Sequence, residues 1–188
     1  MFLITGCGRS GTKYITEVLR QCGLDVGHET LGKDGVVSSI WAVYDSYYPS
    51  YHHQGPRPHF DTVLHQVRHP LDTIGSLMTS SAESWYWNAR HIPIDPERWS
   101  PLRKAEAYYW HWNHLVSHEA VYRYRVEDLV DCWPVVCAFV GLPTDTALPD
   151  VPKDTNHRDH PTVQWKNLFP GWQNLIQRMA KEYGYEVA

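Results

Sequence analysis

The residues best suited to chemistry in this sequence lie in a glycine-rich segment near its beginning, which runs Gly6-Cys7-Gly8-Arg9-Ser10-Gly11-Thr12-Lys13. It stands between a short apolar run and a helical pattern, so the first helical amides face the segment without intrahelical partners. Those amides, the helix dipole and the charges of Arg9 and Lys13 favour an anion, and the glycines let it approach the backbone. The segment therefore predicts an anion-binding loop, with Ser10 and Thr12 as hydroxyl donors and an ordinary glycine turn as the alternative.

The loop departs from the GxxxxGK[ST] pattern of metal-dependent nucleotide-binding loops. Gly6 and Gly11 have the required spacing, but the next two residues stand in reversed order, as Thr12-Lys13. In that pattern the lysine contacts phosphates and the following hydroxyl holds Mg²⁺. The apolar run at 62–67 also leads into Arg68, where an Asp would be needed for the metal. A P-loop kinase or NTPase, which requires Mg²⁺-dependent ATP or GTP binding, is therefore kept only as an alternative.

The elements that must position this loop alternate between strand and helix. Residues 2–5 and 62–67 are typical of buried strands, and 121–126 alternates between large and charged side chains. Apolar spacing predicts helices before Gly23, behind Pro70, and over 102–118 (with Leu115 facing inward), 133–140 and 173–183. Strands that alternate with helices predict a single α/β domain over residues 1–188, with a mostly parallel central sheet and helices on both faces.

Composition limits the partners of the chain. A net charge of −4 and the lack of a basic run argue against nucleic-acid binding, which depends on neutralising phosphates. The N-terminal residues do not have the pattern of a signal peptide, and no apolar run approaches the roughly 20 residues of a membrane span. The four cysteines form no CxxC pair. We expect a soluble, cytoplasmic protein with free thiols and no membrane partner.

Two segments together resemble the nucleotide-binding segments of sulfotransferases that use 3′-phosphoadenosine-5′-phosphosulfate (PAPS). The run from Gly8 to Thr12 resembles the loop that holds the 5′-phosphosulfate. The run Val67-Arg68-His69-Pro70-Leu71-Asp72-Thr73-Ile74-Gly75-Ser76 resembles the segment that holds the 3′-phosphate, with Arg at a strand end and Ser eight residues later. An Arg can donate two parallel hydrogen bonds to a phosphate, and Ser76 would lie about two turns along the helix. The resemblance implies a P-loop NTPase-like sulfotransferase fold that binds PAPS and its product 3′-phosphoadenosine-5′-phosphate (PAP), with no metal.

Further positions match the same family over shorter stretches. Tyr14 stands near the place of an adenine-stacking aromatic, with an ordinary helix position as the alternative. Arg158, in Asn156-His157-Arg158, corresponds to a basic segment that completes the 3′-phosphate site. The run from Tyr122 to Leu129 is similar to a family strand end, except that Val126 replaces a tyrosine.

The resemblance also implies roles in sulfuryl transfer to an acceptor hydroxyl or amine. Arg9 matches the basic residue near the bridging oxygen, while Gly11 and Thr12 would hold the 5′-phosphate. Glu29 is the favoured general base and His28 the second, since either group can take a proton if its pKa suits. A solvated loop pair is the alternative for these two residues. Further base candidates are His52, His53 and His65.

Other functions are weighed against this hypothesis. His111, His114 and His118 share a helix face, but without an HExxH motif or a marked carboxylate ligand we expect no metal site. A non-catalytic nucleotide-binding module would bind PAP without turnover. The acceptor is expected to be a small molecule or a carbohydrate, with small alcohols, saccharides and peptide tyrosines all open. The segments 44–60 and 143–162 are expected to shape its pocket.

Overall fold

The computed structural model describes residues 1–43, 57–152 and 159–187. Its centre is a five-stranded sheet of β1 (Phe2–Thr5), β2 (Val26–His28), β3 (Gly35–Val37), β4 (Thr62–Val67) and β5 (Tyr122–Arg125). The strand order is β2-β3-β1-β4-β5, and every neighbouring pair is parallel. The predicted α/β fold with a mostly parallel sheet is therefore confirmed, and in the described chain all pairs of the sheet are parallel.

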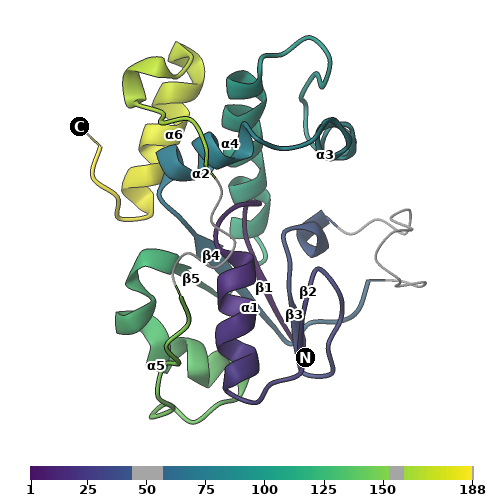
Figure 1. The fold of residues 1–188 in the computed structure, drawn as a ribbon, viewed down its shortest axis with the longest axis vertical. Helices are drawn as coiled ribbons and strands as arrows, with labels where there is room; N and C mark the ends of the chain where they lie inside the picture. Colours follow the sequence, from purple (N-terminus) through teal and green to yellow (C-terminus); the bar gives the residue numbers. More distant parts are fainter. Residues whose placement is uncertain (44–56, 153–158, 188) are drawn as a thin grey trace.

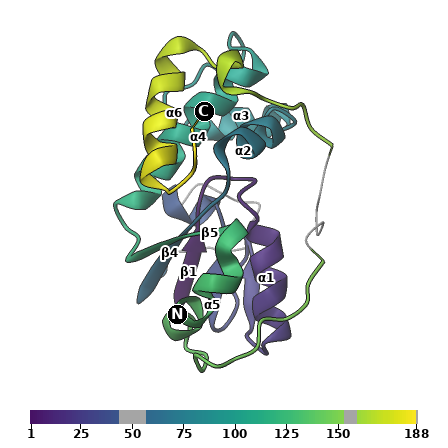
Figure 2. The same ribbon diagram turned by 90° about the vertical axis from the view of Figure 1, so that its left-hand side faces the viewer.

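Helices cover both faces of this sheet (Figures 1 and 2). The α-helices are α1 (Thr12–Gln21), α2 (Pro70–Leu77), α3 (Ala82–Asn88), α4 (Pro101–Ser117), α5 (Leu129–Val140) and α6 (Pro170–Glu182). Short 3₁₀ turns are η1 (Ile40–Val43), η3 (Val126–Asp128) and η4 (Trp165–Asn167). None of the helices in the described part of the chain combines the length and the apolar character needed to cross a membrane.

The alternation of side chains along the strands explains the layers. Ile4 and Leu64 pack with apolar residues of α1 and α5 on one face. Leu3 and Val63 point to the other face, where they pack with Trp41 of η1. Both faces are buried at β1, which is why this strand reads as a continuous apolar run in the sequence.

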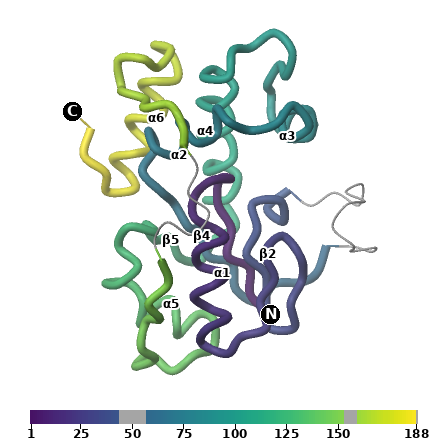
Figure 3. The backbone as a smooth tube through the Cα atoms, viewed as in Figure 1, coloured from purple at the N-terminus to yellow at the C-terminus, as the bar shows by residue number. Residues whose placement is uncertain are grey.

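A second apolar layer lies beyond the carboxyl ends of the strands. There α2, α4 and α6 gather at the end of the molecule opposite the N-terminus (Figure 3), around buried side chains that include Tyr109 and Trp112. Leu115 was predicted to face inward on α4, but it is an exposed side chain and Val116 is buried instead. The apolar face rotates by one residue there because 3.6 residues per turn bring position 116, not 115, back over Trp112 and Tyr109.

Two strands and one α-helix escaped prediction, and two helices begin earlier than predicted, one of them at Pro170 instead of residue 173. The strands β2 and β3 have three residues each, too few for an alternation pattern to appear. The helix α3 is seven residues long and mixes aromatic with polar side chains. The helix predicted at 133–140 begins at Leu129, because Pro134 is accommodated inside the helix.

Candidate active site

A cavity of about 660 Å³ opens at the carboxyl edge of the sheet, a size typical of small-molecule sites. Each of the five strands ends beside it. Its wall includes the loop after β1, His28 and Glu29 at the end of β2, Ser39 after β3, Arg68 after β4 and Val126 after β5. In open parallel sheets this edge is where ligands bind, since the loops that follow the strands converge there.

The glycine loop is held against β4 by backbone packing. A methyl group on Gly6 would lie 2.1 Å from the carbonyl oxygen of Gln66, so only glycine fits there. The buried Gln66 side chain donates to the Ser10 carbonyl at 2.6 Å and accepts from the Tyr124 hydroxyl at 2.7 Å. Gly11 forms the N-cap of α1 with φ of 90° and has no side chain to cap the helix. The first amides of α1 therefore have no capping side chain and remain available to an anion.

Arg9 and Glu29 share an unusual backbone conformation. Their φ angles are 70° and 60°, and they are the non-glycine residues of the described chain with positive φ. This region costs free energy for residues with a Cβ, and such strain concentrates at functional sites. Both strained residues line the cavity.

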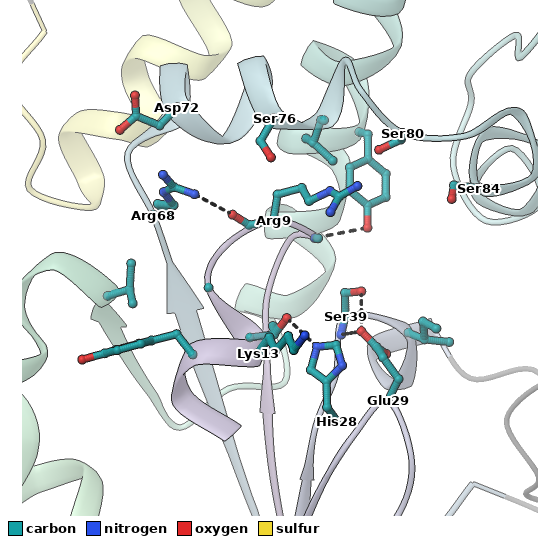
Figure 4. A pocket seen from close by; sticks show the side chains of 18 of the residues that line it. Arg9, Lys13, His28, Glu29, Ser39, Arg68, Asp72, Ser76, Ser80 and Ser84 are labelled. Carbon is teal, nitrogen blue, oxygen red and sulfur yellow. Dashed lines mark hydrogen bonds between the residues drawn. The ribbon is translucent and has the colours of Figure 1, made fainter. Parts of the chain in front are cut away.

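The Glu29 carboxylate lies in a cradle formed by the turn after β3 (Figure 4). The Ser38 hydroxyl donates to Oε2, while the amide and the hydroxyl of Ser39 each approach Oε1 at 3.4 Å. Ser38 is itself fixed, because its oxygen accepts from the amides of Ile40 and Trp41. Burial raises the pKa of Glu29, and the hydrogen bonds from these serines oppose that rise. The result is an oriented carboxylate at the cavity wall.

His28 is engaged with the glycine loop. Its Nε2 lies 3.2 Å from the Thr12 hydroxyl. Burial lowers the pKa of His28 first, and the charges of Lys13 and Arg20 lower it further. His28 therefore favours its neutral form and can orient Thr12 at the start of α1.

The second predicted phosphate segment faces the same cavity. Arg68 and Ser76 both line it, and Arg68 Nη1 contacts the Arg9 carbonyl oxygen at 3.4 Å (Figure 4). Two acidic residues, Asp72 and Glu127, also lie in the wall. Glu127 is occupied there, since it accepts from the His69 amide at 2.7 Å and from the Tyr185 hydroxyl at 2.9 Å.

The structure brings most of the predicted site residues into one cavity wall: Gly8, Arg9, Gly11, Thr12, Lys13, Tyr14, His28, Glu29, Arg68 and Ser76. Ser10 is not in that wall, because its side chain is 1% exposed and its hydroxyl has no hydrogen-bond partner among the described residues. Arg158, His52 and His53 lie outside the described residues, as do 44–56 and 153–158 of the expected pocket segments. His65 is wholly buried against Asn113 and does not line the cavity.

Several wall residues were not predicted from the sequence. Ser39 follows a strand too short to recognise, and Tyr108 lies in a helix whose many aromatic side chains give no separate signal. Near α3 the cavity wall includes three neutral polar side chains and one aromatic ring, which belong to Ser80, Ser84, Asn88 and Trp87. A serine-rich run at 80–84 is the one sequence signal that could have pointed to them.

The histidine face of α4 lies apart from this cavity. His114 and His118 approach each other at 3.3 Å between Nε2 atoms, and His114 stacks on Trp110. Within the described ranges no three His, Cys, Asp or Glu side chains gather as a metal site would require.

The parallel sheet and the helices on both of its faces define an α/β fold, with the glycine loop directly after β1. Among solved structures the chain is similar to one described as "Sulfotransferase Domain from the Curacin Biosynthetic Pathway", with a TM-score of 0.58. The match covers 100% of this chain and 98% of that chain at 14% sequence identity, so it is evidence for the fold. No protein-family model matches the sequence, and neither does any curated protein.

Proposed function

We propose that the protein is a PAPS-dependent sulfotransferase that transfers a sulfuryl group to a hydroxyl or amine of a small acceptor. The observation that carries this proposal is that two separate candidate phosphate sites open on one cavity. The glycine loop with Arg9 and Lys13 is one, and Arg68 with Ser76 is the other. A nucleotide with phosphate groups at both its 5′ and 3′ positions needs two such sites, whereas a nucleoside triphosphate needs only one.

The cavity has groups suited to each part of this donor. The uncapped amides of α1 and the Thr12 hydroxyl would hold the 5′-phosphate. Arg68 would bind the 3′-phosphate through its guanidinium, with Ser76 as a second donor. Tyr14 and Val126, which line the cavity beside the loop, offer an aromatic and an apolar surface to the adenine.

The proposed reaction is an in-line displacement at sulfur. Glu29 takes the proton of the acceptor as the acceptor oxygen or nitrogen forms its bond to sulfur. The bond between sulfur and the bridging oxygen breaks, and its electron pair leaves with PAP. Arg9 stabilises the negative charge that develops on the leaving phosphate, which is electrostatic catalysis by a fixed cation. His28 is the second candidate base, but its contact with Thr12 favours a role in orienting the loop.

The acceptor would enter between Glu29 and α3. In Figure 4, Arg9 lies between Arg68 on one side and Ser80 and Ser84 on the other. The described wall includes two hydroxyls there, from Ser80 and Ser84, together with the Asn88 amide and the Trp87 indole. Neutral hydrogen-bonding groups beside an aromatic ring suit a small hydroxylated molecule or a carbohydrate.

Calorimetric titration with PAP, with and without Mg²⁺ and beside ATP, tests the donor site. We expect binding that does not depend on Mg²⁺ and is stronger than that of ATP. Arg68→Ala should weaken it by roughly 1.5–3 kcal/mol, the cost of a lost hydrogen bond to a charged group. Arg178→Ala, which removes an exposed guanidinium from α6, is the matched control and should have no effect. Mg²⁺-dependent ATP binding without preference for PAP would instead favour a kinase or NTPase.

Turnover separates an enzyme from a binding module. Release of PAP from PAPS should be measured with water, small alcohols and sugars as acceptors. Glu29→Gln should slow this release while PAP binding is retained. Full activity in that variant would exclude Glu29 as the base, and tight PAP binding without turnover by the unmodified protein across the panel would favour a non-catalytic module.

A further inference from the structure

One of the buried side-chain amides in the described chain differs from the others in its hydrogen bonding. These amides belong to Gln66, Asn88 and Asn113. The Gln66 amide is bonded through both its nitrogen and its oxygen, and the Asn113 amide likewise lies 3.0 Å from His65 Nε2 and donates to the Tyr109 carbonyl at 2.9 Å. The Asn88 amide has no hydrogen-bond partner among the described residues, although the residue is only 6% exposed. A buried unpaired amide costs free energy, so this group requires an explanation.

The cavity is the space that this amide reaches. Asn88 lies in the cavity wall, and its amide is not sealed from solvent, in contrast to the unpartnered hydroxyl of Ser10. The helix that carries it has the matching orientation, because Ser84, Trp87 and Asn88 stand at positions i, i+3 and i+4 of α3 and all line the cavity. Trp85 of the same helix packs into the core instead. The helix α3 therefore presents to the cavity a face that includes the unpaired amide.

This face of α3 lies on the side of the cavity proposed for the acceptor molecule. In Figure 4, Ser84 lies on the opposite side of Arg9 from Arg68, and so away from the proposed 3′-phosphate site. The α3 side chains in the wall are uncharged, as is Ser80 just before the helix. A charged group buried against this face would find no ion-pair partner on α3, whereas a neutral group with hydroxyls can be paired there.

We propose that Asn88 is a specificity-determining residue of the acceptor site and that it binds hydroxyls other than the one that receives the sulfuryl group. This inference rests on the proposed function. A side-chain amide has a hydrogen-bond donor and a hydrogen-bond acceptor side by side, and each hydroxyl can serve as either. A molecule with several hydroxyls can therefore pair with both halves of the amide while another of its hydroxyls faces Glu29. A simple alcohol has only the hydroxyl that must face Glu29, so the favoured acceptor is a neutral polyol or sugar.

The lack of a partner in the fold separates this role from a structural one. An acceptor molecule without the extra hydroxyls would cover the amide and leave it unpaired, which is how a polar site rejects such a molecule. Asn88→Leu has a side chain of similar size without polar atoms and should remove this selection. Because the Asn88 amide has no partner in the fold, Asn88→Leu should keep the urea unfolding midpoint of the unmodified protein. Asn113→Leu is the contrasting control, since it removes two hydrogen bonds and should unfold at a lower urea concentration.

The first test is NMR of the side-chain amide groups in ¹⁵N-labelled protein, with the Asn88 signal assigned by its loss in Asn88→Leu. The protein is titrated with glycerol, with glucose and with 1-propanol, which has the three-carbon chain of glycerol and a single hydroxyl. We expect the Asn88 signal to shift with glycerol and glucose but not with 1-propanol. The Asn113 signal is the control and should not shift, because both halves of that amide are already bonded. An Asn88 signal that shifts with neither polyol, or no more than that of Asn113, would overturn the proposal.

The second test is the ratio of kcat/KM for glycerol to kcat/KM for 1-propanol, measured by release of PAP from PAPS. We expect this ratio to be at least about tenfold in the unmodified protein and to fall toward one in Asn88→Leu. A ratio that is the same in both proteins would show that the polyol is selected elsewhere and would overturn the role of Asn88. Absence of PAP release with every acceptor would count against the proposed function. The NMR titration needs no PAP, so it would still decide whether Asn88 binds polyols.

Discussion

Glu106 on α4 makes the stability of this protein dependent on pH in a direction opposite to that of most acidic residues. Its side chain is wholly buried, and Oε1 accepts from the Phe169 amide at the start of α6 at 2.9 Å. Oε2 is buried without a hydrogen-bond partner among the described residues. Burial is the main cause that raises the pKa of Glu106 to about 7, while the Phe169 hydrogen bond and Arg103 oppose the rise. The folded protein therefore holds a proton on Glu106 that the unfolded chain releases near its ordinary pKa of 4.5.

The sign follows from this uptake of a proton on folding. Stability from the protonated carboxyl is fully present below pH 4.5 and is lost as the pH rises through 7. At about 1.4 kcal/mol per pKa unit, the difference between the two pKa values corresponds to a loss of roughly 3 kcal/mol. The loss should begin near pH 5 and approach completion above pH 8. A change of this size is a large part of the usual stability of a single domain.

Urea unfolding at intervals between pH 5 and pH 8 measures this effect. Glu106→Gln keeps an oxygen for the Phe169 amide but cannot ionise, so its free energy of unfolding should fall less than that of the unmodified protein across this range. Glu186→Gln, in the exposed C-terminal tail, is the control and should follow the unmodified protein. If the curves of Glu106→Gln and the unmodified protein run parallel, Glu106 is ionised in the folded protein and the reasoning fails.

Three further predictions concern the sheet and the loop. Burial lowers the pKa of His65 from 6.5 to about 4. The stability that neutral His65 contributes is therefore present above pH 6.5 and is lost as the pH falls through 4. In urea unfolding between pH 4 and pH 6.5, His65→Gln should remove this loss of stability. Gly6→Ala should lower the free energy of unfolding by about 1–3 kcal/mol and weaken PAP binding, because the added methyl group meets the Gln66 carbonyl. The control is Gly171→Ala, whose methyl group meets no atom within 4 Å. It should leave both urea unfolding and PAP binding unchanged. Arg9→Gly should unfold at a higher urea concentration than Arg9→Ala. Glycine adopts a positive φ without strain, whereas this conformation costs other residues roughly 1–2 kcal/mol. Equal unfolding midpoints would show that the backbone is not strained at this position.

The sequence was sufficient for the anion loop because that loop depends on local chemistry. A buried strand, glycines at fixed spacing and an amphipathic helix all leave periodic signals within a short stretch, and β1 and α1 were predicted on that basis. The segment from β4 into α2 was predicted for the same reason, with Pro70 at the first turn of the helix. The parallel sheet then followed from the alternation of these units.

The other half of the cavity could not be derived in this way. The strand β2 pairs with β3, and β3 pairs with β1, so the position of both depends on a partner distant in the sequence. Ser39 and Tyr108 are brought together only because α4 packs against the turn after β3, as the bond from Trp112 to Ser39 shows. A single tyrosine within an aromatic helix gives no signal of its own, since the same residue type would serve equally well as core.

The conformation of Arg9 and Glu29 is the clearest case of information that lies outside local sequence. Nothing in either residue type favours a positive φ, and the preferred residue there would be glycine. The conformation is imposed by the surroundings: Gln66 holds the Ser10 carbonyl beside Arg9, and the Glu29 amide donates to the Val37 carbonyl at 3.0 Å. A protein selected for stability alone would place glycine at both positions. That two long charged side chains stand there instead, facing one cavity, favours a role for both in binding or chemistry over a role in folding.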